Sequence, residues 1–383
     1  MYIVVVEEVT RTIFISAAEA SADMHAAKLI HQLRKEPENV QCEGLGGEAM
    51  AAAGCKLLEN LVNRSAMLTH AIGQVFFYRK LLGRVKRHFA QNPPDVVVAI
   101  DSPAWNFHVA LAAKKVGIPV LYYIAPQLWA WGVWRIGKLQ SRVDTLACIL
   151  PFEESWFRER GIEAQYVGHP LFDDEQEISS PGPWSEISRE FPTVALLPGS
   201  RKHEIQQLWK PMQEIAKNIQ KEFPQARFLT SVSSETNEIL LRRNVEESLA
   251  VDIRRTSVEA ATRYADLALV ASGTATLEVA AQNCPMIILY HVPWLQWHLV
   301  GRWLMKTSFL SLVNILADRE LAPEFMPFGG RIQEVTDKAL SLLQDDDQRQ
   351  EMRIALRDLV EPILKPGAAA QTAKLVKDLL PVY

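Results

Sequence analysis

Cysteine is scarce in this sequence, with four residues scattered along a chain of 383. No two stand at the CxxC spacing of zinc sites and redox motifs, so neither these sites nor a disulfide framework is expected. No apolar run reaches the ~18 residues of a membrane-spanning helix, and the first residues, MYIVVVEEVTRT, lack the basic leader of a signal peptide. The net charge is −4, so no overall basic field attracts nucleic acid. These absences predict a reduced cytoplasmic protein, in solution or on a membrane surface, without a nucleic-acid partner.

Short apolar runs, many of them β-branched, alternate along the chain with amphipathic segments of helical length. Such runs are typical of strands buried on both faces of a parallel sheet, and segments 20–34 and 204–222 have helical spacing. The alternation predicts an α/β fold with doubly wound sheets. The predicted strands are residues 12–16, 96–100, 120–124, 145–150, 194–197, 227–232, 267–270 and 286–290.

The best internal boundary is SSPGPW at residues 179–184, where proline and glycine interrupt both periods. It predicts two similar Rossmann-like domains facing a cleft, residues 1–178 and 185–361. The helical C-terminal stretch is broken by Pro362 and Pro366, and a return of residues 362–383 to the first domain is one arrangement of it. Ligands of such sheets bind at the carboxyl ends of strands, so the loops that follow the strands are the places to look for a site.

One loop of this kind is in TVALLPGSRKHEI, which has the pattern of a strand, a tight turn and a helix. Gly199 and Ser200 let the backbone approach an anion, and Arg201 offers a planar fork of donors that suits phosphate. The alternative is an ordinary turn with a solvated arginine.

A second loop follows the predicted strand 267–270, in DLALVASGTATLEVAAQ. Ser272, Gly273 and Thr274 stand at the start of a helix, where N–H groups and the helix dipole favour negative charge. Glu278 is one turn further, where it either binds ribose hydroxyls or is a plain helix-face glutamate. Two such loops in one half of the chain indicate a diphosphate site. The GxGxxG fingerprint is absent, which disfavours a nicotinamide or flavin enzyme.

In the first half, polar side chains follow the predicted strand 12–16. The segment ISAAEASADMHAA places Glu19, Ser21, Asp23 and His25 at the start of a helix. Carboxylates and a histidine at a strand end suit an acceptor site or a general base. Helix capping explains Ser21 and Asp23 equally well, but it does not explain Glu19 or His25.

Two further strand ends of the first half carry candidate residues. Asp101 and Asn106 lie beyond the strand 96–100, in IDSPAWN, and Gln127 and Trp129 lie in APQLWAW, where tryptophan is either core or the rim of a site. Glu153 in LPFEESWF and His169 in VGHPL come later. His169 is either a packing residue near the domain boundary or a substrate contact.

The segment from Met67 to Phe89, MLTHAIGQVFFYRKLLGRVKRHF, contains no acidic residue. Basic and aromatic residues alternate in it at helical spacing, a pattern typical of a helix that lies on a membrane surface. The alternative is a surface helix that packs its apolar face on its own domain. Residues 287–317 also lack Asp and Glu, and there buried core is the favoured interpretation.

Taken in order, these motifs resemble those of the bacterial lipid-A-disaccharide synthase family, over residues 12 to 326 approximately. The combination of PQLWAW, PFE, VGHP and PGSR is specific to it. The resemblance implies a GT-B glycosyltransferase that joins UDP-2,3-diacylglucosamine to 2,3-diacylglucosamine 1-phosphate. The products are a β-1,6 disaccharide 1-phosphate and UDP, the anomeric centre is inverted, and neither a metal nor another cofactor is needed. It also implies that the enzyme acts at the cytoplasmic face of the inner membrane and that it forms a homodimer through the C-terminal helices.

Carried over by position, the resemblance assigns Arg201 and residues 272–278 to the UDP side, with Asn314 and Glu320 nearby. The acceptor side then comprises Glu19, Ser21, Asn106, Gln127 and Trp129.

The sequence departs from the family pattern at several of these places. Ala18 and Ala22 replace two glycines, and their methyl groups are expected to crowd any close backbone approach. Ala104 replaces an acid that resembles the catalytic base of many members, and Val313 and Asp318 replace a proline and a glycine.

An inverting transfer needs a base to accept the proton of the attacking hydroxyl. Without an acid at position 104, the candidates are Asp101, Asp23 and His25, in that order. Two other functions stay open. One is a different GT-B enzyme acting on UDP-sugars, of the peptidoglycan N-acetylglucosaminyltransferase or UDP-N-acetylglucosamine 2-epimerase type. The other is a catalytically silent relative that binds UDP or lipid.

Overall fold

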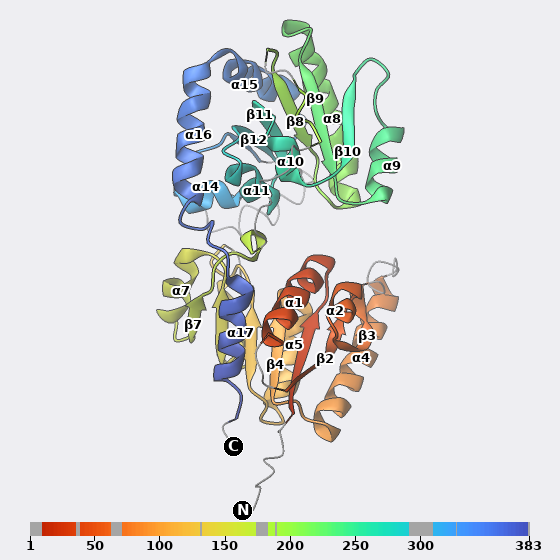
Figure 1. The fold of residues 1–383 in the computed structure, drawn as a ribbon, viewed down its shortest axis with the longest axis vertical. Helices are drawn as coiled ribbons and strands as arrows, with labels where there is room; N and C mark the ends of the chain where they lie inside the picture. The colour runs from red at the N-terminus through yellow and green to blue at the C-terminus, as the bar shows by residue number, and fades with distance from the viewer. Residues whose placement is uncertain are drawn as a thin grey trace, which may run out of the picture. The chain divides into compact units, whose positions relative to one another are not determined.

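The computed structural model describes residues 10–35, 39–62, 71–130, 132–173, 183–187, 190–290, 309–326 and 328–381, with the backbone alone for 71–74. The chain divides into two compact units. Unit 1 comprises Met1–Glu175 and Lys365–Tyr383, and unit 2 comprises Gln176–Leu364. Each unit is built on a parallel sheet with helices on its faces, which confirms the predicted α/β class (Figure 1).

Within the described residues, the sheet of unit 1 has seven strands in the order β3-β2-β1-β4-β5-β6-β7, all parallel. The chain first winds outward from β1 to β3 and then crosses back to β4 beside β1. The strands are β1 (Arg11–Ala17), β2 (Val40–Gly46), β3 (Lys56–Asn60), β4 (Val96–Ile100), β5 (Val120–Tyr123), β6 (Thr145–Cys148) and β7 (Ala164–Tyr166).

Both faces of this sheet are buried because helices cover each of them, and successive strand residues point to opposite faces. Phe14 of β1 packs with one group of helices, whereas its neighbours Ile13 and Ile15 pack with another. The first group is α4 (Ala71–Gln91), α5 (Pro103–Lys114), α6 (Ile136–Gln140) and α7 (Pro151–Arg158). The second group is α1 (Ala20–Leu33), α2 (Glu48–Ala52) and α17 (Ala368–Asp378). The described part of the unit also contains two short 3-10 helices, η1 (Val133–Arg135) and η2 (Pro170–Phe172).

The last helix, α17, belongs to unit 1 although it ends the chain, and Figure 1 shows it beside α1. The Asp173 carboxylate accepts N–H donors from Gly367, Ala368 and Ala369 at 2.6–2.9 Å. These are the N–H groups that a helix start leaves without intrahelical partners. A single carboxylate therefore ties the returning segment to the loop after β7.

In unit 2 the described strands form a six-stranded parallel sheet in the order β10-β9-β8-β11-β12-β13. They are β8 (Thr193–Leu197), β9 (Arg227–Val232), β10 (Val251–Arg255), β11 (Leu267–Ala271), β12 (Met286–Leu289) and β13 (Glu324–Phe325). The helices are α8 (Lys202–Glu222), α9 (Glu235–Arg243), α10 (Val258–Thr262), α11 (Ala275–Ala281), α14 (Leu312–Ala317), α15 (Ile332–Gln344) and α16 (Asp346–Val360).

All eight predicted strands are present, with ends shifted by up to two residues, and the two predicted helical segments are α1 and α8. The strands that the sequence did not predict are short or interrupted in their apolar pattern. In β2, VQCEGLG mixes polar residues and glycine, and in β10, VDIRR is mostly charged because β10 is an edge strand.

The basic segment from Met67 to Phe89 becomes the helix α4, with residues 67–70 outside the described residues. Leu81, Val85 and Phe89 are buried in the core of unit 1. The part of α4 from Leu81 to Phe89 therefore packs its apolar face on its own domain, which was the second of the two interpretations of this segment. Residues 179–182 and 291–308, which carried the predicted boundary and part of the apolar segment 287–317, also lie outside the described residues. No helix in the described portion is long and apolar enough to span a bilayer.

Candidate functional site

Both sheets reverse their winding between two neighbouring strands, β1 and β4 in unit 1 and β8 and β11 in unit 2. Open α/β sheets bind ligands in the crevice beyond the carboxyl ends of strands at such a switch point. The predicted loops start at these four strand ends. In unit 2, residues 199–201 follow β8 and residues 272–274 follow β11, so two loops about 70 residues apart in sequence leave neighbouring strands.

The loop after β8 presents an exposed arginine on a fixed backbone. Gly199 has φ +101°, and a Cβ there would lie 2.3 Å from Oε2 of Glu204, so glycine is required. Glu204 accepts the Arg201 main-chain N–H at 3.1 Å and lies 3.2 Å from its guanidinium Nη1, while 65% of the Arg201 side chain is exposed. The main-chain oxygen of Ser200 accepts the Asn237 side-chain amide at 2.7 Å. The start of α8 is thus pinned, and the arginine faces solvent.

The loop after β11 has an open backbone. Gly273 is exposed with φ +149°, and no described atom comes within 4 Å of a Cβ built there. The Thr276 hydroxyl donates to the Gly273 oxygen at 2.8 Å, while Ser272 is half-buried and Thr274 exposed. Glu278, in the first turn of α11, is half-buried, and burial together with the nearby Glu259 carboxylate raises its pKa. This loop can accept a ligand against its backbone.

Asn314 is not placed to contact a ligand. It is fully buried, its amide nitrogen donates to the Ala322 oxygen and to Oε2 of Glu324, and its amide oxygen accepts two backbone N–H groups at 2.9 Å each. This corrects the assignment of Asn314 to the UDP side, because its hydrogen-bonding capacity is spent on holding segment 309–325 together. Glu320 remains exposed, and its carboxylate accepts the Glu324 N–H at 3.4 Å.

The hub of this segment is Glu324, a residue that sequence reasoning passed over. Its two oxygens accept from the N–H groups of Leu310 and Ser311, the Ser311 hydroxyl and the Asn314 amide, at 2.8–3.2 Å. A Glu closing the motif SLVNILADRELAPE was the available signal. In the same motif Asp318 has φ +50°, the left-handed region in which a glycine is at ease and which Asp tolerates, so this departure from the family pattern fits the backbone.

In unit 1, Asp23 serves as a structural anchor. It is 5% exposed, and its oxygens accept the N–H groups of Gly47, Ala49 and Met50 at 2.7, 3.0 and 3.2 Å. A Cβ at position 47 would lie 2.5 Å from Oδ2 of Asp23, so the carboxylate is closely enclosed. The capping interpretation therefore describes Asp23, although the helix that it caps is α2 rather than its own. These contacts weaken its candidacy as the base.

Asp101 follows β4 on a strained turn. Asp101 and Ser102 have φ values of +49° and +46°, which only a few per cent of non-glycine residues adopt. The Asp101 main-chain oxygen accepts the Tyr122 hydroxyl at 2.6 Å and the Asn106 amide at 2.8 Å. Burial and the Asp101 charge raise the pKa of Tyr122, and Arg135 opposes them. The main chain is thus held from two sides, and the half-buried Asp101 carboxylate stands at the end of β4.

Asn106 is the residue that holds this turn. It is fully buried, and its amide nitrogen also donates to the Ile100 oxygen at 2.8 Å, while its amide oxygen accepts the Ser16 hydroxyl at 2.8 Å. Asn106 thereby ties the end of β1 to the end of β4. This corrects its assignment as an acceptor contact, because the side chain is enclosed. Glu19 and Ser21 do lie exposed at this place, and Glu19 Oε1 accepts the Ser102 hydroxyl at 3.5 Å.

The alanines that replace the family glycines do not crowd an open loop. Ala18 and Ala22 are 6% and 1% exposed, and each belongs to a core cluster, on opposite faces of the sheet. The expectation of crowding was wrong because both methyl groups point into the interior. Ala104 is exposed near the start of α5, so the side chain that lacks the family's carboxylate faces solvent.

Gln127 and Trp129, both in the loop after β5, differ in their exposure to solvent. Gln127 is exposed, whereas Trp129 is 7% exposed and donates its indole N–H to Oε1 of Glu153 at 2.9 Å. Trp129 is therefore a packed residue that shapes the loop rather than a rim residue.

Two histidines of unit 1, His25 on α1 and His169 before η2, influence each other electrostatically. His169 is 4% exposed, and its Nδ1 accepts the Leu171 N–H at 3.3 Å, so a neutral ring carries its proton on Nε2. Burial first, and the charge of His25 second, lower the pKa of His169 to about 4. The ring is therefore a neutral packing residue at physiological pH, which is the first of its two interpretations.

Replacing His169 by asparagine is expected to remove part of the acid sensitivity of folding. Because the folded-state pKa is about 4 and the ordinary value 6.5, the unfolded chain binds the extra proton between them. This contribution is fully present above the ordinary pKa and is lost as pH falls toward the folded one, a change of about 3 kcal/mol. Urea unfolding of both proteins at neutral pH and near the folded-state pKa measures it. An equal loss of stability in parent and variant would contradict a buried neutral ring.

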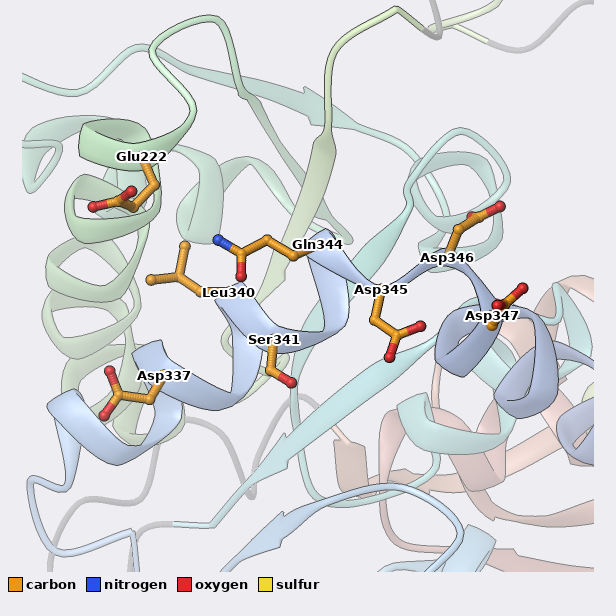
Figure 2. A pocket seen from close by; sticks show the side chains of 8 residues that line it. All are labelled: Glu222, Asp337, Leu340, Ser341, Gln344, Asp345, Asp346 and Asp347. Atoms are coloured by element: carbon orange, nitrogen blue, oxygen red, sulfur yellow. The ribbon is translucent and has the colours of Figure 1, made fainter.

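Carboxylates also gather in unit 2, in a hollow where the end of α8 meets α15 and the start of α16 (Figure 2). Helix α8 begins after Arg201 and ends at Glu222, so this hollow lies at the opposite end of α8 from Arg201. No group of three or more His, Cys, Asp or Glu in the described portion of the chain is arranged to hold a metal ion. The hollow is lined by Glu222, Asp337, Leu340, Ser341, Gln344, Asp345, Asp346 and Asp347.

Two parallel α/β units, each doubly wound, are the architecture of the GT-B class, and solved structures of that class match the chain. A glycotransferase of kitacinnamycin has a TM-score of 0.62 at 11% identity, covering 97% of this chain and 99% of that one. MurG of Acinetobacter baumannii has a TM-score of 0.57 at 15% identity, covering 96% and 99%. These likenesses confirm the predicted GT-B fold class.

The family described as lipid-A-disaccharide synthetase matches residues 13–378. A lipid-A-disaccharide synthase of Syntrophus aciditrophicus is 33% identical over 377 residues, which cover 97% of this chain and 98% of the relative. The chain belongs to the lipid-A-disaccharide synthetase family, as the resemblance of its motifs implied.

Proposed function

We propose that the protein joins UDP-2,3-diacylglucosamine to 2,3-diacylglucosamine 1-phosphate, giving the β-1,6-linked disaccharide 1-phosphate and UDP. The observation that carries the proposal is family membership over nearly the whole chain, combined with polar loops at both switch points. In the reaction O6 of the acceptor attacks C1 of the donor sugar, the C1–oxygen bond to the diphosphate breaks, and the O6 proton passes to a base.

The donor belongs to unit 2 in this proposal. Arg201 and the backbone around Gly273 would meet the charge that develops on the departing diphosphate, and such preorganised donors stabilise a transition state strongly. Their exposure on adjacent strand ends supports this role. In this proposal Glu278 accepts hydrogen bonds from the ribose hydroxyls. Glu320, which is exposed, is also assigned to the donor. Neither a metal nor another cofactor has a part in it.

The acceptor belongs to unit 1, and Asp101 is the base. Asp23 has three backbone donors on its carboxylate, so it is poorly placed to gain a proton without loss of structure. His25 is the remaining candidate. Glu19, Ser21 and Gln127 are exposed at the same edge and would contact the acceptor, whereas Asn106 and Trp129 position the loops.

We also propose that α4 meets the cytoplasmic face of the inner membrane. Phe76 and Val75 are 74% and 59% exposed, and Arg79 and Lys80 follow them with exposed side chains. Exposed apolar residues beside cations suit a surface of anionic lipid. Acylated substrates give such contact a purpose.

Replacing Phe76 by Ser together with Arg79 and Lys80 by Glu is expected to weaken binding to vesicles of anionic lipid about tenfold. The matched control reverses Lys210 and Arg243, which are exposed on unit 2. Arg84 is left unchanged because it donates to Glu59 Oε2 and to the Leu58 oxygen. Co-sedimentation across salt concentrations measures the effect, and equal binding by all three proteins would rule the surface out.

The proposed activity is tested with purified protein and both acylated substrates, following UDP release and the mass of the product. UDP release that requires both substrates supports the proposal. Turnover with unacylated N-acetylglucosamine acceptors would favour a different GT-B enzyme, and UDP binding without turnover would favour the silent relative.

A further inference from the structure

One buried carboxylate joins two segments at the carboxyl edge of unit 1, the loop 126–130 after β5 and the start of α7 after β6. Glu153 is 1% exposed. Its Oε2 accepts the N–H groups of Ile149 and Leu150 at 3.1 Å each, and its Oε1 accepts the indole N–H of Trp129 at 2.9 Å.

Capping of α7 explains only half of this arrangement. A glutamate at the third helical position commonly reaches back to the N-cap N–H, and Oε2 alone makes that contact here. Oε1 is committed to a residue 24 positions earlier, on the loop of a different strand. Ring contact adds to this link, since Trp129 and Phe152 of α7 meet edge to face at 5.0 Å.

All three partners of Glu153 are donors, so the site suits a group that accepts only, which is an ionised carboxylate. Burial raises the pKa of Glu153 to about 7, and the three hydrogen bonds oppose this rise. Burying the ionised Glu153 carboxylate therefore costs free energy, and a neutral side chain would cap the helix at a lower cost. A residue that only caps α7 would not need the hydrogen bond that Glu153 accepts from Trp129.

The loop that Trp129 belongs to carries an exposed polar residue. Gln127 is exposed between two tight backbone turns, Leu128 N–H to Pro126 oxygen at 2.6 Å and Ala130 N–H to Gln127 oxygen at 3.2 Å. Gln127 and Trp129 thus lie two residues apart in one short, tightly turned loop.

We propose that Glu153 is a positioning residue for the acceptor, acting through Trp129 to hold Gln127 where the acceptor sugar binds. It touches no substrate itself. The inference rests on the proposed function, because the acceptor side was assigned there.

The test is Glu153→Gln. The amide can keep its oxygen on the two backbone N–H groups, which leaves its NH2 facing the indole N–H, so only the Trp129 link is lost. We expect the KM for the acceptor to rise about tenfold, with kcat and the KM for the donor changed less than about twofold. Amide hydrogen exchange in a peptide covering residues 125–130 is expected to become faster while exchange in α7 stays unchanged.

Two further variants separate positioning from general destabilisation. Trp129→Phe removes the indole donor, so the variant that carries both substitutions is expected to lose no more than Trp129→Phe alone. Trp156→Phe, a change to a half-buried tryptophan on α7 whose ring packs on Phe157, is the matched control and should leave the acceptor KM as it is.

An unchanged acceptor KM and unchanged exchange at 125–130 in Glu153→Gln would overturn the proposal. So would a parallel rise of both KM values with a lower Tm, which a merely structural residue would produce. If the parent protein does not turn over, the proposed function fails, and the exchange experiment still reports on the link between Glu153 and the loop.

Discussion

Arg201→Ala is expected to lower kcat by about 10²–10³-fold, the scale on which single charge-stabilising donors act. Arg201 stands at the start of α8, after β8, and β8 is paired with β11, which carries the second loop. In the proposed reaction Arg201 meets the diphosphate charge as UDP leaves. Its ion pair with Glu204 is solvent-exposed and contributes little to stability, so the variant should fold. Steady-state UDP release and calorimetric UDP binding measure the two parts of the effect.

The matched control is Arg243→Ala, an exposed arginine on α9 of the same unit. Arg201→Lys should recover part of the lost rate, since it restores the charge but not the planar fork of donors. If Arg201→Ala turns over at a rate close to that of the parent, the assignment of the diphosphate to this loop is incorrect.

Asp101→Asn is expected to lower kcat by about 10³-fold while leaving the KM for the donor nearly unchanged. Asparagine tolerates the left-handed backbone of this position, and the Asp101 main-chain contacts to Tyr122 and Asn106 do not involve the side chain. The substitution therefore removes the proton acceptor and keeps the turn.

Two other carboxylate variants show whether the effect is chemical. Asp95 accepts the Thr12 N–H at 2.7 Å at the start of β4, so Asp95→Asn should lower stability without a large change in kcat. Asp23→Asn should do the same, because it breaks contacts at the start of α2. A large loss of kcat in His25→Asn together with a mild one in Asp101→Asn would move the base to His25.

The buried strands and the switch-point loops could be predicted because each depends on local pattern. A strand such as β4, VVVAI, is buried on both faces and is continuous in apolar character. Doubly wound sheets place their first and fourth strands side by side, so the loops bearing Gly199 and Gly273 could be expected to meet.

Some site assignments were wrong because a local sequence pattern does not show which polar side chains are buried. Asn106 and Asn314 stand in motifs rich in polar residues, but both are enclosed and braced by backbone groups. The roles of Glu153 and Glu324 were missed for the same reason, since each depends on partners 13–24 positions away on another segment. The edge strand β10 was missed because solvent exposure removes the apolar signal.

The most direct test of the central claim is the linkage of the product formed from UDP-2,3-diacylglucosamine and 2,3-diacylglucosamine 1-phosphate, determined by NMR. Attack by O6 with departure of UDP predicts a single disaccharide 1-phosphate, β-linked from C1 to O6, formed together with an equal amount of UDP. An α-linked disaccharide, a linkage to another hydroxyl, or UDP release that yields only free diacylglucosamine would contradict the proposed reaction.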